Sequence, residues 1–472
     1  MTIGHTRPLP PGAPPGAGLP PGFVLGVTST AASVEGDDTA GGRTPSVWDV
    51  VALAPGRIAD GSTPAVGAAL ADHWPGDLAL LTGLGVPAFR MSLSWSRLQP
   101  GGRGSAAAAG VEYYDRMLDS LLAAGIAPWV TLLHWDLPLE LMQEGGWLAR
   151  DTASAFAEYA ALAAERFGDR VAAWITHDEA VLHTAYGYAV GIDAPGLTLL
   201  GSAFATTHHQ LLGHGLAVAA LRAGSGAPVG IANHHTAVAP ATGAVADRGA
   251  ARWYDGYHNR QFTDPLFLGR YPGALLRAPG VDESVVQDGD LAVLAAPLDF
   301  YGVGYYSPTT VTAVPENRSV PFSLDHPADA AHTDNGHPVD AAGLTTVLTD
   351  LTARYPALPP LVVTGNGAAF DDRPDPAGGQ RDDRARIAFL DDHLAAVVAA
   401  RAAGADVRGY FHRSLLDGWE FADGHTARYG LVAVDRADLS RRPRASFHHY
   451  ADLVRRHRAT HPTGPGPVWP AR

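Results

Sequence analysis

The stretch VVTGNGAAFDD, from Val362 to Asp372, has the pattern of a buried strand that ends at a functional site. It begins with apolar, β-branched residues, as expected for a strand covered on both faces of a parallel sheet. Small and polar residues follow at once, starting with Gly365 and Asn366. Because a buried parallel strand needs similar strands beside it, we expect the same pattern elsewhere in the chain.

Eight stretches of this kind are spread along the sequence. They are FVLGVTS from Phe23, AFRMSLSW from Ala88, APWVTLLHW from Ala127, VAAWITHDE from Val171, APVGIANHH from Ala227, DFYGVGYYS from Asp299, PLVVTGNG from Pro360 and VRGYFHRSLLD from Val407. Residues 153–169 and 386–404, which lie between such stretches, place apolar side chains three and four positions apart and predict helices. Eight alternating units predict an α/β fold with a single (β/α)8 TIM barrel and elongated βα loops.

Composition excludes several classes of function. The chain has 472 residues, of which 46% are hydrophobic and 17% charged, so it can bury a substantial core. Its net charge of -14, with no basic cluster, excludes nucleic acid as an expected partner. The sequence contains neither cysteine nor lysine, which excludes thiolate nucleophiles, Schiff-base and pyridoxal-phosphate chemistry and Walker-type phosphate loops.

The domain organisation follows from the same pattern. We expect a flexible Pro/Gly-rich arm over residues 1–22, the barrel over 23–460 and a loosely held tail over 461–472. The first residues lack the charged and apolar regions of a secretory signal, and no stretch approaches the ~18 apolar residues of a membrane helix. The expectation is a soluble cytoplasmic protein that acts on a small molecule, with no membrane partner.

The 21 histidines do not predict a metal site. Adjacent pairs such as His208-His209, His234-His235 and His448-His449 lack metal-ligand spacing. We therefore expect ordinary helix and loop histidines, and neither a metal nor a cofactor.

Polar and aromatic residues collect where the predicted strands end. These positions are His134-Trp135-Asp136, His177-Asp178-Glu179, Tyr305-Tyr306, Gly365-Asn366 and Arg413 to Asp417. The carboxyl ends of barrel strands carry the reaction site in this fold, so we expect these side chains to share one rim. The alternative is that they only cap the helices that follow.

At this point the chain resembles the family-one glycoside hydrolases, typified by retaining β-glucosidases, from about Phe23 to Leu453. The resemblance is carried by SVWDV (46–50), FRMSLSWSRLQP (89–100), LLHWDLP (132–138), GGWLARDT (145–152), WITHDEA (174–180), DPLFLGRYP (264–272), DFYGVGYYSP (299–308), TGNGAAFDD (364–372) and SLLDGWEF (414–421). It implies a TIM barrel and a two-carboxylate mechanism, with one proton donor and one nucleophile roughly 5–5.5 Å apart.

The resemblance implies that the proton donor is retained and the nucleophile is not. The family's Asn-Glu-Pro motif is matched by Asp178-Glu179-Ala180, which makes Glu179 the donor. Its Thr-Glu-Asn-Gly motif is matched by Thr364-Gly365-Asn366-Gly367. Glycine has no side chain with which to attack a sugar, so Gly365 occupies the place of the nucleophile without its function.

Other sugar-binding positions of the family are also altered. The resemblance places Ser33 where a glutamine grips hydroxyls, Asp178 and Gly304 where asparagines stand, and Arg413 and Phe421 where tryptophans stand. It retains His134, Tyr306 and Glu420, and Trp135 follows His134 at the rim. Several altered contacts in one pocket favour natural divergence to another ligand over a single laboratory substitution.

Two arginines suggest an anionic ligand. In the family, the arginine matched by Arg90 accompanies the nucleophilic carboxylate, and Arg413 adds a second positive charge. A buried, unpaired guanidinium costs several kcal/mol. One hypothesis is that both bind a carboxylate, phosphate or enolate of the ligand; the alternative is that Asp178 or Glu420 neutralises them.

Three functions remain open. The first is an enzyme that uses Glu179 as general acid/base, with Asp178, His134 or Tyr306 as its partner. Its reaction would be transfer, substrate-assisted cleavage, cyclisation, elimination or isomerisation. Its substrate would be a glycosidic or cyclic molecule, for example in specialised-metabolite biosynthesis. The second is a catalytically silent ligand-binding protein. The third is an ordinary β-glucosidase in which another acid, such as Asp371 or Asp372, replaces the nucleophile.

Overall fold

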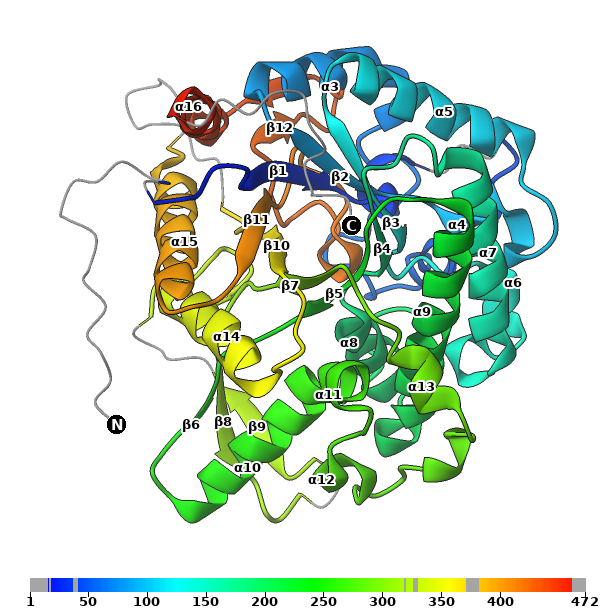
Figure 1. Ribbon diagram of the computed structural model, residues 1–472, viewed down its shortest axis with the longest axis vertical. Coiled ribbons are helices and arrows are strands. Elements are labelled where there is room, and N and C mark those ends of the chain that lie inside the picture. Colours follow the sequence, from blue (N-terminus) through cyan, green and yellow to red (C-terminus); the bar gives the residue numbers. More distant parts are fainter. Residues whose placement is uncertain are drawn as a thin grey trace.

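The computed structural model describes residues 16, 18–36, 41–317, 320–325, 330–370 and 382–460. Most of the predicted arm, the whole predicted tail, and Asp371 and Asp372 lie outside the described residues. The described part is built around one closed barrel (Figure 1).

Eight parallel strands close the barrel in the order β1-β11-β10-β7-β5-β4-β3-β2. Their bounds are β1 (Val24–Ser29), β2 (Ala88–Ser92), β3 (Ala127–Leu133), β4 (Ala173–His177), β5 (Val229–His234), β7 (Phe300–Gly304), β10 (Leu361–Asn366) and β11 (Val407–His412). Each lies within one of the eight predicted stretches, so the predicted barrel is confirmed.

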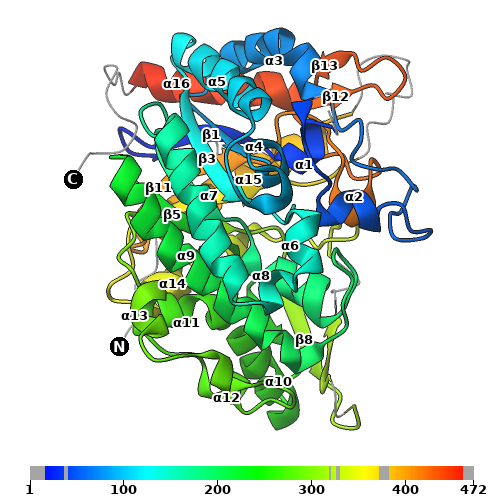
Figure 2. The same cartoon turned by 90° about the vertical axis from the view of Figure 1, so that its right-hand side faces the viewer.

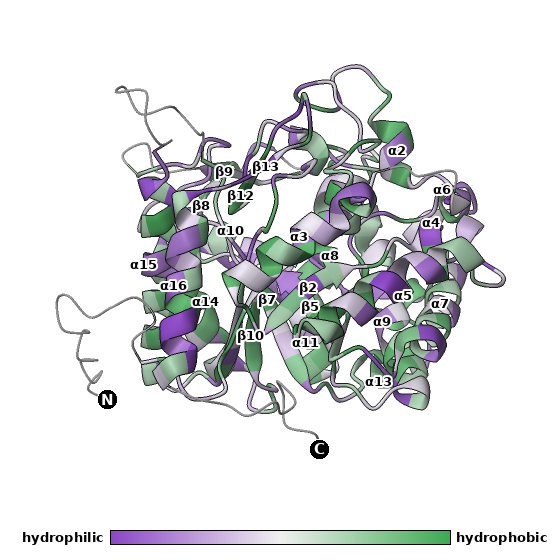
Figure 3. Ribbon diagram, turned by 90° about the horizontal axis from the view of Figure 1, so that it is seen from above, coloured by the Kyte–Doolittle hydropathy of each residue, from purple (hydrophilic) through white to green (hydrophobic). Residues whose placement is uncertain are grey.

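The barrel interior is filled with side chains. A separate apolar cluster joins residues from all eight strands, and Figure 3 shows hydrophobic, green segments along β10. Trp129 lies at its centre, with ring centroids 5.2 Å from Phe300 and 4.9 Å from Phe411. This packed layer leaves the strand ends as the place for a reaction site.

Helices cover the outside of the barrel. The longer ones are α3 (Leu70–Leu84), α5 (Ala108–Ala123), α7 (Asp151–Phe167), α9 (Phe204–Gly224), α10 (Val245–Asp255), α11 (Gln261–Leu268), α14 (Ala341–Arg354), α15 (Arg384–Ala402) and α16 (Ala445–Thr460). Helices α7 and α15 begin and end two residues before the predicted ranges. Figures 1 and 2 place α3, α5 and α16 at one end of the long axis and α10 at the other.

Short elements fill the loops at the strand ends. They are α1 (Ala31–Val34), α2 (Val47–Val51), α4 (Trp95–Leu98), α6 (Leu139–Gln143), α8 (Ala180–Leu182), α12 (Gly273–Leu276), α13 (Asp290–Leu294), η2 (Pro100–Gly102), η3 (Gly146–Leu148), η4 (His183–Ala189), η5 (Leu200–Ala203), η6 (Gly256–Arg260), η7 (Glu283–Val285) and η8 (Phe421–Asp423).

Two small sheets were not predicted. The first joins β6 (Val238–Pro240), β8 (Thr309–Ala313) and β9 (Phe322–Asp325), and the second joins β12 (Val432–Val434) and β13 (Arg441–Pro443). Within the described ranges, none of the helices combines the length and hydropathy that a membrane crossing requires.

Candidate active site

Asp178 and Glu179 extend β4 beyond its last residue. The backbone amide of Asp178 donates to Leu133 O and that of Glu179 donates to Ala232 O, each at 3.0 Å. These bonds fix the two acids between the neighbouring strands β3 and β5. Glu179 has a left-handed φ of 50°. Such a conformation costs a non-glycine residue about 1–3 kcal/mol and is found where surrounding contacts hold a functional group in place.

An aromatic wall stands beside these acids. Trp135 (φ 72°) and Phe421 (φ 41°) also have left-handed backbones, and their ring centroids are 4.6 Å apart. The indole Nε1 of Trp135 donates to Asp178 O at 3.0 Å, and the His134 ring lies 5.7 Å from that of Phe421. Three predicted site residues therefore lie together beside Asp178.

Asp178 is the centre of a buried charge network. Its Oδ2 accepts from Arg90 and lies 3.0 Å from Nδ1 of His134. Arg90 also donates to Thr364 O at 2.7 Å and to Thr131 Oγ1 at 3.2 Å. Burial alone would raise the pKa of Asp178, but Arg90 and His134 outweigh it and hold that pKa well below its ordinary value. Of the two interpretations of Arg90, the structure supports internal neutralisation, because Asp178 is its ion-pair partner.

His134 has one ring nitrogen left for a ligand. A carboxylate only accepts hydrogen bonds, so Nδ1 carries the proton toward Asp178 and Nε2 is an acceptor. Nε2 is buried and has no hydrogen-bond partner among the described residues. Burial lowers the pKa of His134 in spite of the nearby Asp178, so the ring is neutral.

Glu179 keeps its proton at neutral pH. Burial and the charge of Asp178 raise the pKa of Glu179 from 4.5 to about 8. It precedes α8, but its side chain makes no capping hydrogen bond to that helix. The capping alternative therefore does not apply to Glu179.

Two glycines lie side by side below Glu179. Gly304 on β7 pairs in register with Gly365 on β10. A Cβ on Gly304 would lie 2.6 Å from Oε1 of Glu179, and a Cβ on Gly365 would lie 2.8 Å from Oη of Tyr306. Paired strands are ~4.8 Å apart, so a side chain at residue 365 would begin close to Glu179, on the same side of the sheet as a side chain at residue 304.

Arg413 is also neutralised within the protein. Its guanidinium forms an ion pair with Glu420, and Nη1 donates to Tyr306 Oη at 3.3 Å. The same guanidinium lies 4.8 Å from the ring centroid of Tyr429 and 5.6 Å from that of Tyr306. As at Arg90, the alternative of internal neutralisation is confirmed. Neither arginine needs an anionic ligand to balance its charge.

Ser33 is likewise engaged by the protein. It is buried, and its Oγ donates to the backbone oxygen of Trp419 at 2.7 Å. With Ser33 held there and Glu420 held by Arg413, two predicted substrate contacts already have protein partners.

Sequence reasoning missed two pocket residues. Tyr429 lies in the loop after β11 and contacts Arg413. No motif or periodic pattern in the sequence around it indicates a place in the site. His234 was predicted to be an ordinary loop histidine, but its ring stacks on Tyr306, with centroids 5.8 Å apart and planes within 5°. A histidine at the carboxyl end of a predicted barrel strand was the available signal.

The described residues include no group of three or more His, Asp or Glu side chains that could hold a metal ion.

Comparison with known proteins identifies the class that this barrel and rim define. Residues 16–459 match the family described as Glycosyl hydrolase family 1, to which the chain belongs. Thermostable beta-glucosidase B of Thermobispora bispora is 40% identical over 93% of this chain and 91% of its own. Psychrophilic beta-glucosidase BglU of Micrococcus antarcticus superposes with a TM-score of 0.89, at 37% identity over 93% of this chain and 98% of its own.

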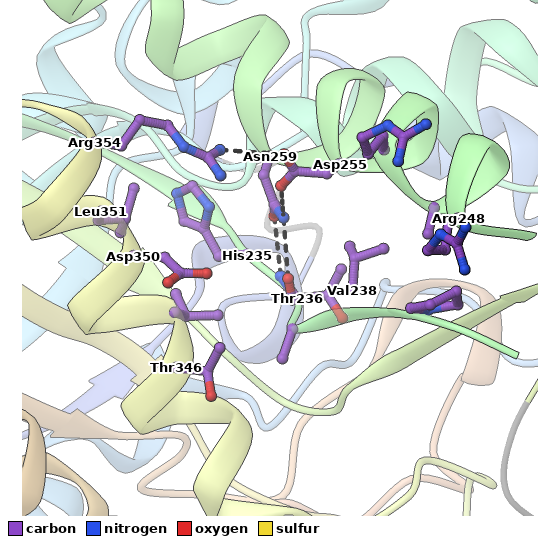
Figure 4. A pocket seen from close by; sticks show the side chains of 15 residues that line it. His235, Thr236, Val238, Arg248, Asp255, Asn259, Thr346, Asp350, Leu351 and Arg354 are labelled. Atoms are coloured by element: carbon purple, nitrogen blue, oxygen red, sulfur yellow. Dashed lines mark hydrogen bonds and ion pairs between the residues drawn. The ribbon is translucent and has the colours of Figure 1, made fainter. Parts of the chain in front are cut away.

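Two cavities lie away from Glu179. Figure 4 shows one of about 350 Å³ between α10 and α14, where Arg354 pairs with Asp255 at 3.2 Å and Asn259 bonds to Thr236. The other, of about 480 Å³, is lined by η4, α10 and α12. Neither is lined by Glu179.

Proposed function

We propose that this family-1 chain is an enzyme that acts on a small glycosidic or cyclic molecule through Glu179, without a sugar ester at residue 365. The observation that carries the proposal is the pair of adjacent acids with opposite pKa shifts. Glu179 is protonated at neutral pH, whereas Asp178 is ionised. Environments that separate two pKa values in this way are typical of acid/base catalysis.

Each residue then has a separate role. Glu179 gives its proton to the leaving oxygen of the substrate as the bond between carbon and that oxygen breaks. A hydroxyl of the substrate, or of a second molecule, bonds to the same carbon and returns a proton to Glu179. Asp178, tied to Arg90 and His134, is too weak a base to accept that proton and instead keeps Glu179 protonated. Nε2 of His134 accepts a hydrogen bond from a hydroxyl of the ligand.

Tyr306 lines the same pocket. Its hydroxyl oxygen would lie 2.8 Å from a Cβ at residue 365 and accepts a hydrogen bond from Arg413. We propose that Tyr306 contacts the part of the ligand that a retaining enzyme would hold against its nucleophile. Trp135 and Phe421 form an aromatic wall beside Asp178.

The relatives supply the alternative function. They are named as β-glucosidases and align over 93% of this chain, which favours sugar hydrolysis. Against it, Ser33 bonds to backbone, Glu420 is paired with Arg413, and residue 365 has no side chain. The proposed chemistry needs no nucleophile at residue 365, whereas ordinary retaining hydrolysis needs one from elsewhere.

Turnover by matched variants tests the proposal. Wild type, Glu179→Gln and the exposed control Glu158→Gln are incubated with aryl β-glucosides, glucosyl fluoride and a mixture of natural glycosides, and products are followed by mass spectrometry. Glu179→Gln should lower turnover by about 100-fold or more, and Glu158→Gln should leave it unchanged. Binding without turnover by wild type would support a silent binding protein. A phenol burst with a trapped sugar ester would support an ordinary β-glucosidase.

A further inference from the structure

We propose that the cavity of about 480 Å³ binds a flat, largely apolar small molecule that carries a hydrogen-bond acceptor. The cavity lies outside the barrel, where η4, η5 and the start of α9 meet α10, η6, α12 and β9. Figures 1 and 2 show α10 and α12 together at one end of the molecule. None of the predicted catalytic residues lines it.

Aromatic rings form one wall of this cavity. Trp253 stacks on Tyr257 with centroids 5.5 Å apart and planes within 10°. Phe322 lies 5.3 Å from Trp253 and 5.5 Å from Tyr254. A wall of aromatic faces and edges favours a planar apolar ligand, because ring pairs gain from both stacked and edge contacts.

The mouth of the cavity is unusually apolar for a surface. Its rim includes side chains with 37–58% of their area exposed, namely Val190, Ile192, Leu200 and Leu324. Single exposed apolar residues need no explanation, but several around one cavity mark a binding site. A small molecule fits better than a protein partner, because the cavity extends inward to the buried residue Gln261.

Gln261 supplies the polar contact. It is only 2% exposed, and its Oε1 accepts from Thr207 Oγ1 at 3.4 Å. Its Nε2 is buried and has no hydrogen-bond partner among the described residues. An unsatisfied buried donor is rare in native proteins, because it loses its hydration without compensation. A carbonyl or ether oxygen of the ligand would satisfy it.

Two histidines separate this cavity from the candidate active site. His258 lines the cavity, and its Nε2 lies 2.8 Å from Nδ1 of His234, which stacks on Tyr306. Burial lowers the pKa of both rings, so neither is charged at neutral pH. Glu179 is neither in the cavity lining nor in this histidine pair, so we expect ligand binding in the cavity to be independent of the chemistry proposed for Glu179.

Equilibrium dialysis with two probes tests the proposal. Coumarin is flat and has a carbonyl acceptor, whereas naphthalene has a similar two-ring frame and no acceptor. Both should bind wild type saturably. Gln261→Leu should weaken coumarin binding about fivefold, the effect of one neutral hydrogen bond, and leave naphthalene binding unchanged.

Further variants serve as controls for this binding measurement and define the results that would contradict the proposal. Ile192→Ser should weaken the binding of both probes severalfold, whereas Val245→Ser, which is 74% exposed and outside the cavity, should change neither. Glu179→Gln should also leave both affinities unchanged, so a failed catalytic proposal would not affect this result. Absence of saturable binding to wild type would overturn the inference, as would affinities that neither Gln261→Leu nor Ile192→Ser changes.

Discussion

Replacing Glu179 by Gln should stabilise the fold, and the gain should grow as the pH rises. The pKa of Glu179 is about 8 in the folded protein instead of 4.5, because burial and Asp178 disfavour its charge. Below pH 4.5 the carboxyl is protonated in both the folded and unfolded states and has no effect on stability. Between these two pKa values the unfolded chain releases a proton that the folded chain retains, so wild-type stability falls as pH rises.

The size of the effect follows from the same two values. A pKa raised from 4.5 to about 8 corresponds to about 5 kcal/mol of unfolding free energy at most. Glutamine cannot ionise, so Glu179→Gln avoids this loss. Urea unfolding of wild type, Glu179→Gln and the exposed control Glu158→Gln would be compared from about pH 4 to pH 9. If the stability of wild type and Glu179→Gln changed in parallel over that range, the assignment of a protonated Glu179 would be refuted.

Three further substitutions test the buried contacts. Asp178→Asn should destabilise the fold at pH 7 by about 3–5 kcal/mol, because it leaves Arg90 buried without a counter-charge, and urea unfolding would measure the loss. Arg413→Ala should lower the melting temperature for the same reason, since its carboxylate partner is 6% exposed; an unchanged melting temperature would argue against the pair. Gly365→Ala should destabilise by about 1–3 kcal/mol by crowding Tyr306, and adding Tyr306→Phe should recover most of that loss in a double-mutant cycle.

The fold could be predicted because its signal is local. Buried parallel strands read as short apolar runs, and all eight were found by that pattern. The strands of the two small sheets were missed because they are three to five residues long and pair over long distances, as β6 does with β8. Such pairing depends on tertiary contacts and not on local sequence.

The sequence predicted most residues of the site, but it did not decide which charged side chains form ion pairs. The positions of the residues at the ends of the predicted strands indicated that they share one rim. Arg90 and Asp178, however, are 88 positions apart in the sequence, and only the closed barrel brings them together. The sequence left two partners open for Arg90, an anion of the ligand and an acid of the protein such as Asp178, and only the structure decides between them. Tyr429 was missed for a similar reason, since a loop residue that packs on Arg413 leaves no periodic signal.

Intact-mass analysis during turnover tests the central claim most directly. Wild type would be quenched while it consumes an activated 2-fluoro glycoside, and its mass would be compared before and after hydroxylamine, which cleaves esters. Because residue 365 lacks a carboxylate, we expect the mass of the unmodified chain at every time point. A hydroxylamine-sensitive gain of one sugar would contradict the account.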